Sequence, residues 1–322
     1  MARVLVTRRL PDGGLDPLVA AGHEIVARDG DTPLTKDELC AAVAAVDAVV
    51  CLLTDRIDAD VLDAGAGRLR VVSNVAVGYD NIDVRAAAER GIAVTNTPGV
   101  LDETTADLAF LLILGAARLA SEAERDLRAG VWDGWEITEY LGVDVHGATL
   151  GIVGFGRIGQ AVARRATGFG MQVRHHTRHD TGLPGWTGDL DGLLASSDFV
   201  SLHTPLTDET RHLVDARRLA LMKPTAVLVN TARGPVVDEE ALADALHEGR
   251  LFAAGIDVYE YEPLINERLL TAPRAMLLPH LGSASVATRV RMAHLACDGA
   301  IAVLAGDTPP NLVHPPSSSM RF

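Results

Sequence analysis

Short apolar runs alternate with longer segments of helical character along most of the chain. Such runs are typical of strands buried on both faces, and strands that alternate with helices form parallel sheets covered by helices. The runs fall into two series, so the sequence predicts two α/β domains. The first series is RVLVT, HEIVA, DAVVCLL, LRVVSNV and IAVTN, and the second is TLGIVG, QVRHH, FVSLH, AVLVN, FAAGIDV and AMLLPH.

Two long helical segments set the predicted domain boundaries. A helix at about 102–127 separates the two series, and Asp102 and Glu103 in its first turn suit the positive end of the helix dipole. A second helix at 284–305 follows the last predicted strand and precedes a Pro-rich tail. We interpret the second helix as a return of the chain to the first domain. The predicted domains are residues 1–99 plus 285–322, and residues 100–284.

Composition narrows the expected partners and compartment. The chain has 322 residues, 48% of them hydrophobic, and a net charge of −14 without a basic stripe, which argues against nucleic acid as a partner. Cys40, Cys51 and Cys297 have no metal-type spacing, as expected in a reducing compartment. The N-terminus lacks a signal-type apolar region, and the most apolar stretch, 108–120, is too short to span a bilayer. We therefore expect a cytoplasmic protein without membrane contact.

A glycine pattern, G-x-G-x-x-G, follows the first strand of the second series and opens a helix. Gly154 permits a tight turn, Gly156 lets a pyrophosphate approach the backbone, and Gly159 allows close packing of helix on strand. The helix N-terminus, with Arg157 and Ile158, then faces the phosphates. Because a strand and a helix flank the glycines, we interpret the loop as a dinucleotide site and not as an ordinary turn.

The end of the next strand, QVRHH, departs from the usual pattern for NAD. About 20 residues past such a glycine loop, an Asp or Glu commonly binds the ribose hydroxyls of NAD. Thr177 and Arg178 stand there instead. A guanidinium pairs well with phosphate, and Thr177 can add a hydroxyl donor, so this pair favours NADPH. Two alternatives remain: Asp180 binds the ribose if the strand runs longer, or Arg178 is a solvated loop residue.

Three histidines lie in this same stretch. His175 and His176 are adjacent in a strand and point to opposite faces, so they cannot share a metal ion. His179 could add a donor to the phosphate pocket. We expect no metal site in this protein.

Three polar side chains follow apolar strands late in the chain: Arg233, Glu262 and His280. Open α/β sheets place their sites at the carboxyl ends of strands, so these side chains are candidates for one site. An acid, a carboxylate that orients it and a cation that holds an anion are what reduction of a 2-keto acid requires. Alternatively, the histidine is structural and Glu262, which precedes Pro263, is a turn residue.

The chain resembles the D-isomer-specific 2-hydroxyacid dehydrogenases, and most of all their glyoxylate/hydroxypyruvate reductase branch. The resemblance runs over nearly the whole length. It rests on the glycine loop and on the segments NVAVGYDNID, VTNTPGVLDETTADLAF, HTPLTDETRHLV, NTARGPVVDE, GIDVYEYEP and LLPHLGSAS, which occur in the same order.

The resemblance implies a role for each candidate residue. His280 would protonate the substrate carbonyl oxygen as hydride arrives at the carbon, and Glu262 would bind the other imidazole nitrogen and favour the protonated ring. Arg233 would hold the substrate carboxylate and polarise the carbonyl. The backbone N–H groups of Val77 and Gly78, in the first domain, would hold the same carboxylate.

The resemblance also implies the fold and the cofactor contacts. The expected fold is α/β with two Rossmann-like domains and a cleft between them: a flavodoxin-like substrate domain, and an NAD(P)-binding domain with a doubly wound parallel sheet. Asp257 would orient the nicotinamide carboxamide. Further positions that match residues lining the cofactor are Thr105, Pro205, Thr210, Thr231, Ala232 and Gly282.

We expect Leu53 and Trp135 to limit the size of the substrate, and Trp135 to take part in the assembly of subunits. Leu53 follows a strand of the first domain, and Trp135 lies near Trp132 in a loop before the glycine-loop strand. In the reductases that the chain resembles, the counterpart of Trp135 reaches into the partner's active site in a homodimer formed by the nucleotide-binding domains. Such walls would admit glyoxylate and hydroxypyruvate but exclude branched 2-keto acids. Alternatively, both tryptophans only fill the interface.

We therefore expect an enzyme that reduces small 2-keto acids to glycolate or D-glycerate and prefers NADPH, with NAD possible. One alternative is an NAD-dependent D-2-hydroxyacid or phosphoglycerate dehydrogenase, although the sequence shows no added basic cluster for a substrate phosphate. Another is a non-catalytic nicotinamide-sensing protein, which the presence of Arg233, Glu262 and His280 does not exclude.

Overall fold

The computed structural model describes residues 1–28 and 30–315, which form two compact units. Unit 1 consists of Met1–Leu101 and the chain from Ser283 onward, and unit 2 is Asp102–Gly282. Every strand predicted from the sequence is present, and β8 (Trp186–Thr187) is an additional two-residue strand. The prediction of parallel α/β sheets in both halves of the chain is confirmed.

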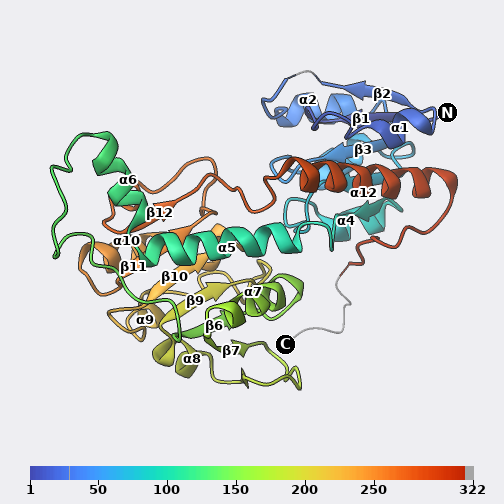
Figure 1. The fold of residues 1–322 in the computed structure, drawn as a ribbon. Coiled ribbons are helices and arrows are strands. Elements are labelled where there is room, and N and C mark those ends of the chain that lie inside the picture. Colours follow the sequence, from blue (N-terminus) through green and yellow to red (C-terminus); the bar gives the residue numbers. More distant parts are fainter. Residues whose placement is uncertain (29, 316–322) are drawn as a thin grey trace. The chain divides into compact units, whose positions relative to one another are not determined.

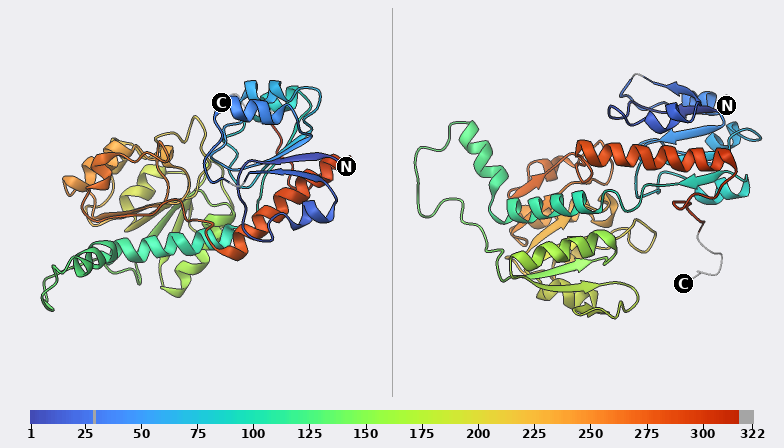
Figure 2. Two further views of the ribbon diagram at one scale, coloured as in Figure 1. Left: turned by 90° about the horizontal axis from the view of Figure 1, so that it is seen from above. Right: turned by 45° about the vertical axis from the view of Figure 1, so that its right-hand side comes forward.

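Unit 1 is built on a five-stranded parallel sheet in the order β2-β1-β3-β4-β5 (Figure 1). Helices α2, α3 and α4 pack on one face, while α12 lies on the other beside α1 (Figure 2). The elements are β1 (Arg3–Val6), α1 (Asp16–Ala20), β2 (Glu24–Ala27), α2 (Lys36–Val43), β3 (Ala48–Cys51), α3 (Ala59–Ala64), β4 (Val71–Asn74), α4 (Val84–Glu89), β5 (Ala93–Thr95) and α12 (Val286–Ala305). The helix expected at 284–305 is thus confirmed as α12.

Unit 2 is built on a seven-stranded parallel sheet in the order β12-β11-β10-β9-β6-β7-β8. Helices α5 and α7 form a core with one face, and α8, α9, α10 and α11 form a second core with the other. The elements are α5 (Asp102–Ala117), α6 (Ala120–Arg128), β6 (Thr149–Val153), α7 (Arg157–Gly168), β7 (Gln172–His176), β8, α8 (Leu190–Ser196), β9 (Phe199–Leu202), α9 (Ala216–Leu219), β10 (Val227–Asn230), the 3₁₀ turn Gly234–Val236, α10 (Glu239–His247), β11 (Ala253–Ile256), α11 (Glu267–Leu270) and β12 (Ala275–Leu277).

The strand order reverses once in each sheet, which marks the expected ligand sites. The reversal lies between β1 and β3 in unit 1 and between β6 and β9 in unit 2. Open α/β sheets bind their ligands at the carboxyl ends of strands near such a point. In unit 2 the glycine loop follows β6 directly, so the fold places it where a dinucleotide is expected.

The single helix expected at 102–127 is wrong, because α5 and α6 are separate and bent by 69°. Leu119 at the break has a left-handed φ of 53°. The N–H of Val143 donates to the carbonyl of Ala117 at 2.9 Å, so the returning chain takes an acceptor that a continuous helix would use. Among the described residues no single helix has the length and apolar character to cross a membrane; the bent pair α5–α6 meets those criteria only when taken together.

Candidate active site

The carboxyl ends of three adjacent strands carry the predicted catalytic residues. Strands β10, β11 and β12 are neighbours in the sheet of unit 2. Arg233 follows β10, Glu262 follows β11 and His280 follows β12. The fold therefore brings to one edge of the sheet three residues that are far apart in the sequence.

His280 and Glu262 form a hydrogen-bonded pair. Nδ1 of His280 lies 2.9 Å from Oε2 of Glu262, and the other carboxylate oxygen accepts the N–H of Tyr259 at 2.9 Å. An ionised carboxylate only accepts, so Nδ1 carries the hydrogen and Nε2 remains for a substrate. The side chains of His280 and Glu262 are 28% and 26% exposed, so a ligand can reach the pair.

The electrostatics of the pair favour an ionised carboxylate. Burial alone would raise the pKa of Glu262, but the hydrogen bond and charge of His280 outweigh it and hold the pKa below its ordinary value. The N–H of Tyr259 and the charge of Arg233 act in the same direction. Glu262 is thus placed to stabilise a protonated imidazole.

Asp257 supports the turn that carries His280. Its backbone oxygen accepts the N–H of His280 at 2.9 Å, and its carboxylate accepts the N–H groups of Leu281 at 2.6 Å and Gly282 at 2.9 Å. His280 has a left-handed φ of 56°, which few residues other than glycine adopt, so these bonds hold a strained turn. Burial raises the pKa of Asp257 to about 6. The expected contact with a nicotinamide would therefore be made by a carboxylate that already holds this turn.

The loop with Arg233 packs against the loop with Glu262. A Cβ at Gly234 would overlap the carbonyl group of Tyr259, so only glycine permits this approach. Asn230 fixes the start of the Arg233 loop, because its amide donates to the carbonyl of Arg233 at 2.9 Å and accepts the N–H of Ala232 at 3.0 Å. The position of the Arg233 loop beside the Glu262 loop is thus set by backbone packing and by the side chain of Asn230.

Sequence reasoning missed Glu239, which anchors the loop with Glu262. Glu239 is only 7% exposed, and its two carboxylate oxygens accept the N–H groups of Glu260 and Asn266, both at 2.8 Å. These bonds hold the loop on both sides of Glu262. The sequence gives one weak signal, an acidic residue at the start of α10, which is equally typical of helix N-termini.

The glycine loop fits a dinucleotide pyrophosphate. Gly154 has a φ of 92°, and a Cβ there would lie 2.6 Å from the carbonyl carbon of His203. At Gly156 a Cβ would meet no described atom within 4 Å, so the backbone is open on that side. Helix α7 starts without a side-chain cap, which leaves the N–H groups of its first turn for a phosphate. Gly159 is buried, and a Cβ there would overlap the carbonyl of Gly154, as close packing requires.

The residues at the start of α7 differ in their contacts. Arg157 is exposed, and its Nε lies 3.4 Å from Oδ2 of Asp102. Ile158 packs against the core between α5, α7 and the sheet, so a phosphate would meet its backbone and not its side chain.

The expected ribose end of the site is the chain after β7. The strand ends at His176, so Thr177 and Arg178 directly follow it. The hydroxyl of Thr177 donates to the carbonyl of His179 at 2.7 Å, and the carboxylate of Asp180 accepts the N–H of Gly182 at 2.8 Å. Both side chains thus shape the turn, and Arg178, which is exposed, is the residue best suited to a phosphate.

The adjacent histidines of β7 have separate contacts. Nε2 of His175 lies 2.8 Å from the hydroxyl of Thr181, and its ring stacks on Phe155 of the glycine loop at 3.7 Å. Nδ1 of His176 lies 2.9 Å from the carbonyl oxygen of Thr187. His175 therefore packs against the glycine loop through Phe155.

Two threonine hydroxyls at the carboxyl ends of the neighbouring strands β9 and β10 are candidates for contact with a ligand. The buried Oγ1 atoms of Thr204 and Thr231, which follow β9 and β10, have no hydrogen-bond partner among the described residues. A buried hydroxyl is ordinarily hydrogen-bonded, so these two suit a ligand. Thr231 was expected here, whereas Thr204 was missed.

The remaining expected cofactor positions shape the surrounding loops. The hydroxyl of Thr105 donates to the carbonyl of Gly282 at 3.2 Å, which ties α5 to the turn after His280. The hydroxyl of Thr210 donates to the carbonyl of Pro205 at 2.7 Å and closes the loop after β9.

Unit 1 carries the expected carboxylate donors after β4. Val77 and Gly78 are half-buried residues, and their N–H groups donate to no acceptor within residues 1–28 and 30–315. The amide of Asn74 donates to the carbonyl of Gly78 at 2.8 Å. Two unpaired neighbouring N–H groups in a fixed turn are suited to an anion.

The loop with Leu53 is also held firmly. Asp55 is only 3% exposed, and its carboxylate accepts the N–H of Leu52 at 2.8 Å and the hydroxyl of Thr7 at 2.5 Å. The amide of Asn81 donates to the carbonyls of Leu52 and Asp55 at 3.2 and 3.0 Å. Leu53 is therefore a half-buried side chain on a rigid loop.

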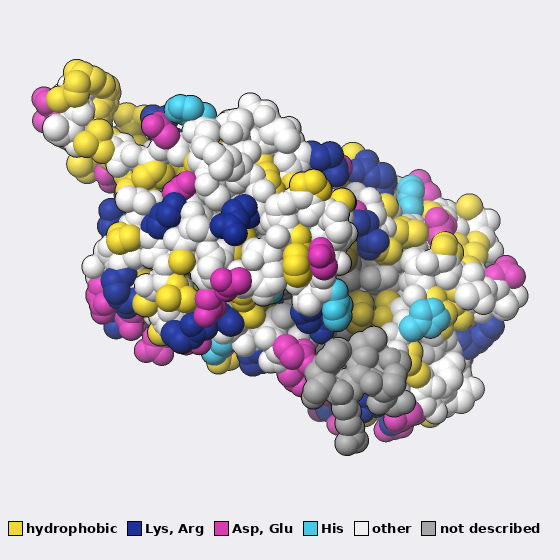
Figure 3. All heavy atoms as spheres, turned by 90° about the horizontal axis from the view of Figure 1, so that it is seen from below, with side chains coloured by type: hydrophobic (Ala, Val, Ile, Leu, Met, Phe, Trp, Pro, Cys, Tyr) yellow, Lys and Arg dark blue, Asp and Glu magenta, His cyan; other side chains and the backbone are white. Residues whose placement is uncertain are grey.

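Trp135 lies in an arm of unit 2 that joins α6 to β6. Trp135 is 76% exposed and Trp132 is 50% exposed. Hydrophobic side chains cover a projecting lobe of the surface (Figure 3). The exposed apolar residues of α6 and the arm, here called the arm patch, are Leu127, Val131, Trp132, Trp135, Ile137 and Leu141. A contiguous apolar patch of this kind is typical of an interaction surface.

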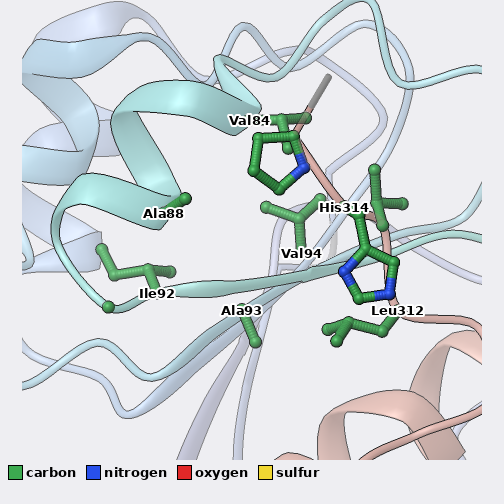
Figure 4. A pocket seen from close by; sticks show the side chains of 10 residues that line it. Val84, Ala88, Ile92, Ala93, Val94, Leu312 and His314 are labelled. Carbon is green, nitrogen blue, oxygen red and sulfur yellow. The ribbon is translucent and has the colours of Figure 1, made fainter. Parts of the chain in front are cut away.

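A separate hollow of about 230 Å³ lies in unit 1 (Figure 4). Side chains of α4, β5 and residues 312–315 line it, and they are apolar apart from His314. None of the expected site residues belongs to this lining. The hollow therefore has no chemistry to add to the site described above.

Residues 110–282 match the family described as D-isomer specific 2-hydroxyacid dehydrogenase, NAD binding domain. The chain belongs to this family. This 2-hydroxyacid dehydrogenase is 50% identical to a glyoxylate reductase of Korarchaeum cryptofilum over 321 residues, which cover 97% of this chain and 96% of that one.

Two solved structures are similar over 97% of the chain. The TT0316 protein of Thermus thermophilus has a TM-score of 0.92 and 48% identity, with 97% of this chain and 100% of that chain covered. An NADPH-dependent glyoxylate/hydroxypyruvate reductase of Sinorhizobium meliloti, in complex with NADP and malonate, has a TM-score of 0.85 and 36% identity, with 97% and 96% covered. The protein is therefore an oxidoreductase that uses a nicotinamide dinucleotide.

Proposed function

We propose that this dehydrogenase reduces glyoxylate and hydroxypyruvate to glycolate and D-glycerate, with NADPH as the preferred cofactor. The observation that carries the proposal is the His280–Glu262 pair, which lies at the same sheet edge as Arg233. This set supplies an acid, its orienting carboxylate and an anion-binding cation. The similarity to a glyoxylate reductase at 50% identity supports the same substrate class.

In the proposed reaction, Arg233 and the N–H groups of Val77 and Gly78 bind the substrate carboxylate. The glycine loop would hold the pyrophosphate of the dinucleotide, whose nicotinamide would supply a hydride to the carbonyl carbon. His280 donates its Nε2 proton to the carbonyl oxygen as negative charge develops there. Glu262 holds Nδ1–H throughout, so it stabilises the imidazolium before the transfer and fixes the neutral tautomer afterwards.

The cofactor preference rests on Arg178. It follows directly on the end of β7, where NAD-specific sites have an acidic residue. Asp180, the alternative ribose ligand, already accepts the N–H of Gly182 in the local turn. A guanidinium at this position suits the 2′-phosphate of NADPH, and a related structure contains NADP.

Substrate size and assembly rest on Leu53 and on the arm patch. We assign the arm patch to a homodimer, in which Trp135 of each subunit reaches the partner's substrate. Large exposed aromatic residues are typical of interface cores, and Trp135 is 76% exposed in a single chain. If Leu53 also lines the substrate site, the site would admit a hydrogen or a hydroxymethyl group on the keto carbon.

We also assign the enzyme to the cytoplasm. Cys51 and Cys297 are buried free thiols, as is typical of proteins from a reducing compartment. Cys40, which is half-buried, is free as well.

The direct test is to mix the purified protein with NADPH and glyoxylate and follow the absorbance of NADPH. Turnover that needs both substrates, with glycolate as product, supports the proposal. Hydroxypyruvate with chiral analysis of the glycerate tests the D configuration. Binding of NADPH without turnover of either keto acid would favour the nicotinamide-sensing alternative.

A further inference from the structure

We propose that Asn96 is a positioning residue for the substrate carboxylate, because its side chain fixes the peptide whose N–H group binds that anion. The inference rests on the proposed function, in which the N–H groups of Val77 and Gly78 bind the carboxylate. All of the contacts that carry it lie within unit 1.

Asn96 binds the Val77–Gly78 peptide on its carbonyl side. Its Nδ2 donates to the carbonyl of Val77 at 2.7 Å. The C=O and N–H groups of a trans peptide point in opposite directions, and within the described residues the only cis peptide is Glu262–Pro263. The bond to the Val77 carbonyl therefore sets the direction of the Gly78 N–H on the other side of the same peptide.

The preceding peptide is held in the same way. The backbone N–H of Thr97 donates to the carbonyl of Ala76 at 2.9 Å, which sets the direction of the Val77 N–H. Both of these donors come from the chain that directly follows β5. The chain after β5 thus orients both N–H groups: the side chain of Asn96 orients that of Gly78, and the backbone of Thr97 orients that of Val77.

Asn96 is itself held in place. The amide of Asn311 donates to the carbonyl of Asn96 at 2.7 Å, and the N–H of Asn96 lies 3.3 Å from the carbonyl oxygen of Asn311. The hydrogen bond from Asn96 to the carbonyl of Val77 polarises the Val77–Gly78 peptide and strengthens the Gly78 N–H as a donor. Asn96 is therefore assigned to the binding of an anion, whereas the proposed proton transfer belongs to the His280–Glu262 pair of unit 2.

The test measures carboxylate binding separately from turnover. In Asn96→Ala, the KM for glyoxylate and the Kd of oxamate for the NADPH-bound enzyme should both rise by about tenfold. This is about 1.4 kcal/mol, which lies within the range of one neutral hydrogen bond. The kcat at saturating glyoxylate, its pH profile and the Kd of NADPH should stay close to those of the parent. Asn96→Asp keeps the size but loses the donor, and its charge opposes both the Val77 carbonyl and the substrate, so its loss should be larger.

Asn311→Ala is the control, because Asn311 supports the backbone of Asn96 without touching the Val77 carbonyl. It should lower the melting temperature about as much as Asn96→Ala but change oxamate binding much less. If the parent is active, either of two results would overturn the role of Asn96. One is an equal loss of oxamate binding in Asn96→Ala and Asn311→Ala. The other is unchanged oxamate binding in both Asn96→Ala and Asn96→Asp. A parent that neither reduces glyoxylate nor binds oxamate would overturn the proposed function and this inference with it.

Discussion

Nδ1 of His280 lies 2.9 Å from Oε2 of Glu262, and the two residues come from the loops after the adjacent strands β12 and β11. The second carboxylate oxygen is held by the N–H of Tyr259, so Glu262 cannot turn away from the imidazole without losing that bond. The hydrogen on Nδ1 is thereby fixed, and Nε2 is the atom that can exchange a proton with a substrate. In the proposed reaction the pair would act as a single oriented acid.

Glu262→Gln should move the pH profile of reduction to lower pH. The amide keeps a hydrogen-bond acceptor but removes the charge that favours the protonated imidazole. The carboxylate is ionised in the working range, because His280 holds the pKa of Glu262 below its ordinary value despite burial. Reduction requires protonated His280, so activity should decline at a lower pH in the variant than in the parent. The measurement is kcat/KM for glyoxylate as a function of pH, and an unchanged profile would remove Glu262 from this role.

His280→Ala should lower kcat/KM for glyoxylate by about 10²- to 10⁴-fold, the usual contribution of a general acid. Binding of NADPH, followed by fluorescence titration, should be preserved because the glycine loop is untouched. The matched control is His146→Ala, which removes an exposed histidine of the same unit and should leave both values unchanged. A His280→Ala variant with parental turnover would contradict the proposed mechanism.

The strands, and the position of the candidate catalytic residues at one sheet edge, could be predicted because their signals are local. Each strand is an apolar run, and Glu262 and His280 stand out as polar residues shortly after two such runs. Parallel strands then bring the ends of neighbouring runs to one edge without further information. The order of elements along the chain was sufficient for this part of the site.

The features that were missed depend on contacts between distant segments. The break at Leu119 occurs where the N–H of Val143 donates to the carbonyl of Ala117, and the pattern of α5 and α6 contains no sign of that contact. The role of Glu239 depends on two N–H groups of a loop that lies beyond the next strand. In both cases the residue types are ordinary for a helix end, so their roles emerge only from the packed structure.

Arg178→Ala should weaken the use of NADPH selectively. The loss of one charged hydrogen bond to the 2′-phosphate costs about 1.5–3 kcal/mol of transition-state binding, so kcat/KM for NADPH should fall by about 10- to 150-fold. The kcat/KM for NADH should change little. Arg211→Ala, which removes another exposed arginine of unit 2, is the control for the change in net charge. Equal losses for both cofactors, or a parent that prefers NADH, would show that Arg178 does not bind the phosphate.

Glu239→Gln should destabilise the protein and misplace the catalytic loop. The carboxylate accepts two backbone N–H groups, whereas an amide has one acceptor atom and would present a donor to the other N–H. The expected loss is about 1–3 kcal/mol in the free energy of unfolding, measured by denaturant titration, together with a lower kcat. The adjacent Glu240→Gln is the control, since Glu240 is exposed, and equal effects of the two changes would contradict the anchoring role.

Trp135→Ala should widen the range of substrates without breaking the dimer. The arm patch buries several apolar side chains in the proposed interface, so loss of one aromatic ring leaves the remaining contacts in place. If Trp135 also closes the partner's site, its removal should raise activity on a branched 2-keto acid relative to glyoxylate. The measurement is the ratio of kcat/KM values for the two substrates, with the mass in solution determined by light scattering.

Trp132→Ala is the matched control, because Trp132 lies in the same arm and is 50% exposed. If Trp132 only fills the interface, its removal should weaken association of the subunits and leave the ratio of substrates unchanged. A monomeric parent would rule out a site shared between subunits. A dimeric Trp135→Ala variant with an unchanged ratio would assign both tryptophans to the interface alone, and Leu53 would then be the remaining residue proposed here to limit substrate size.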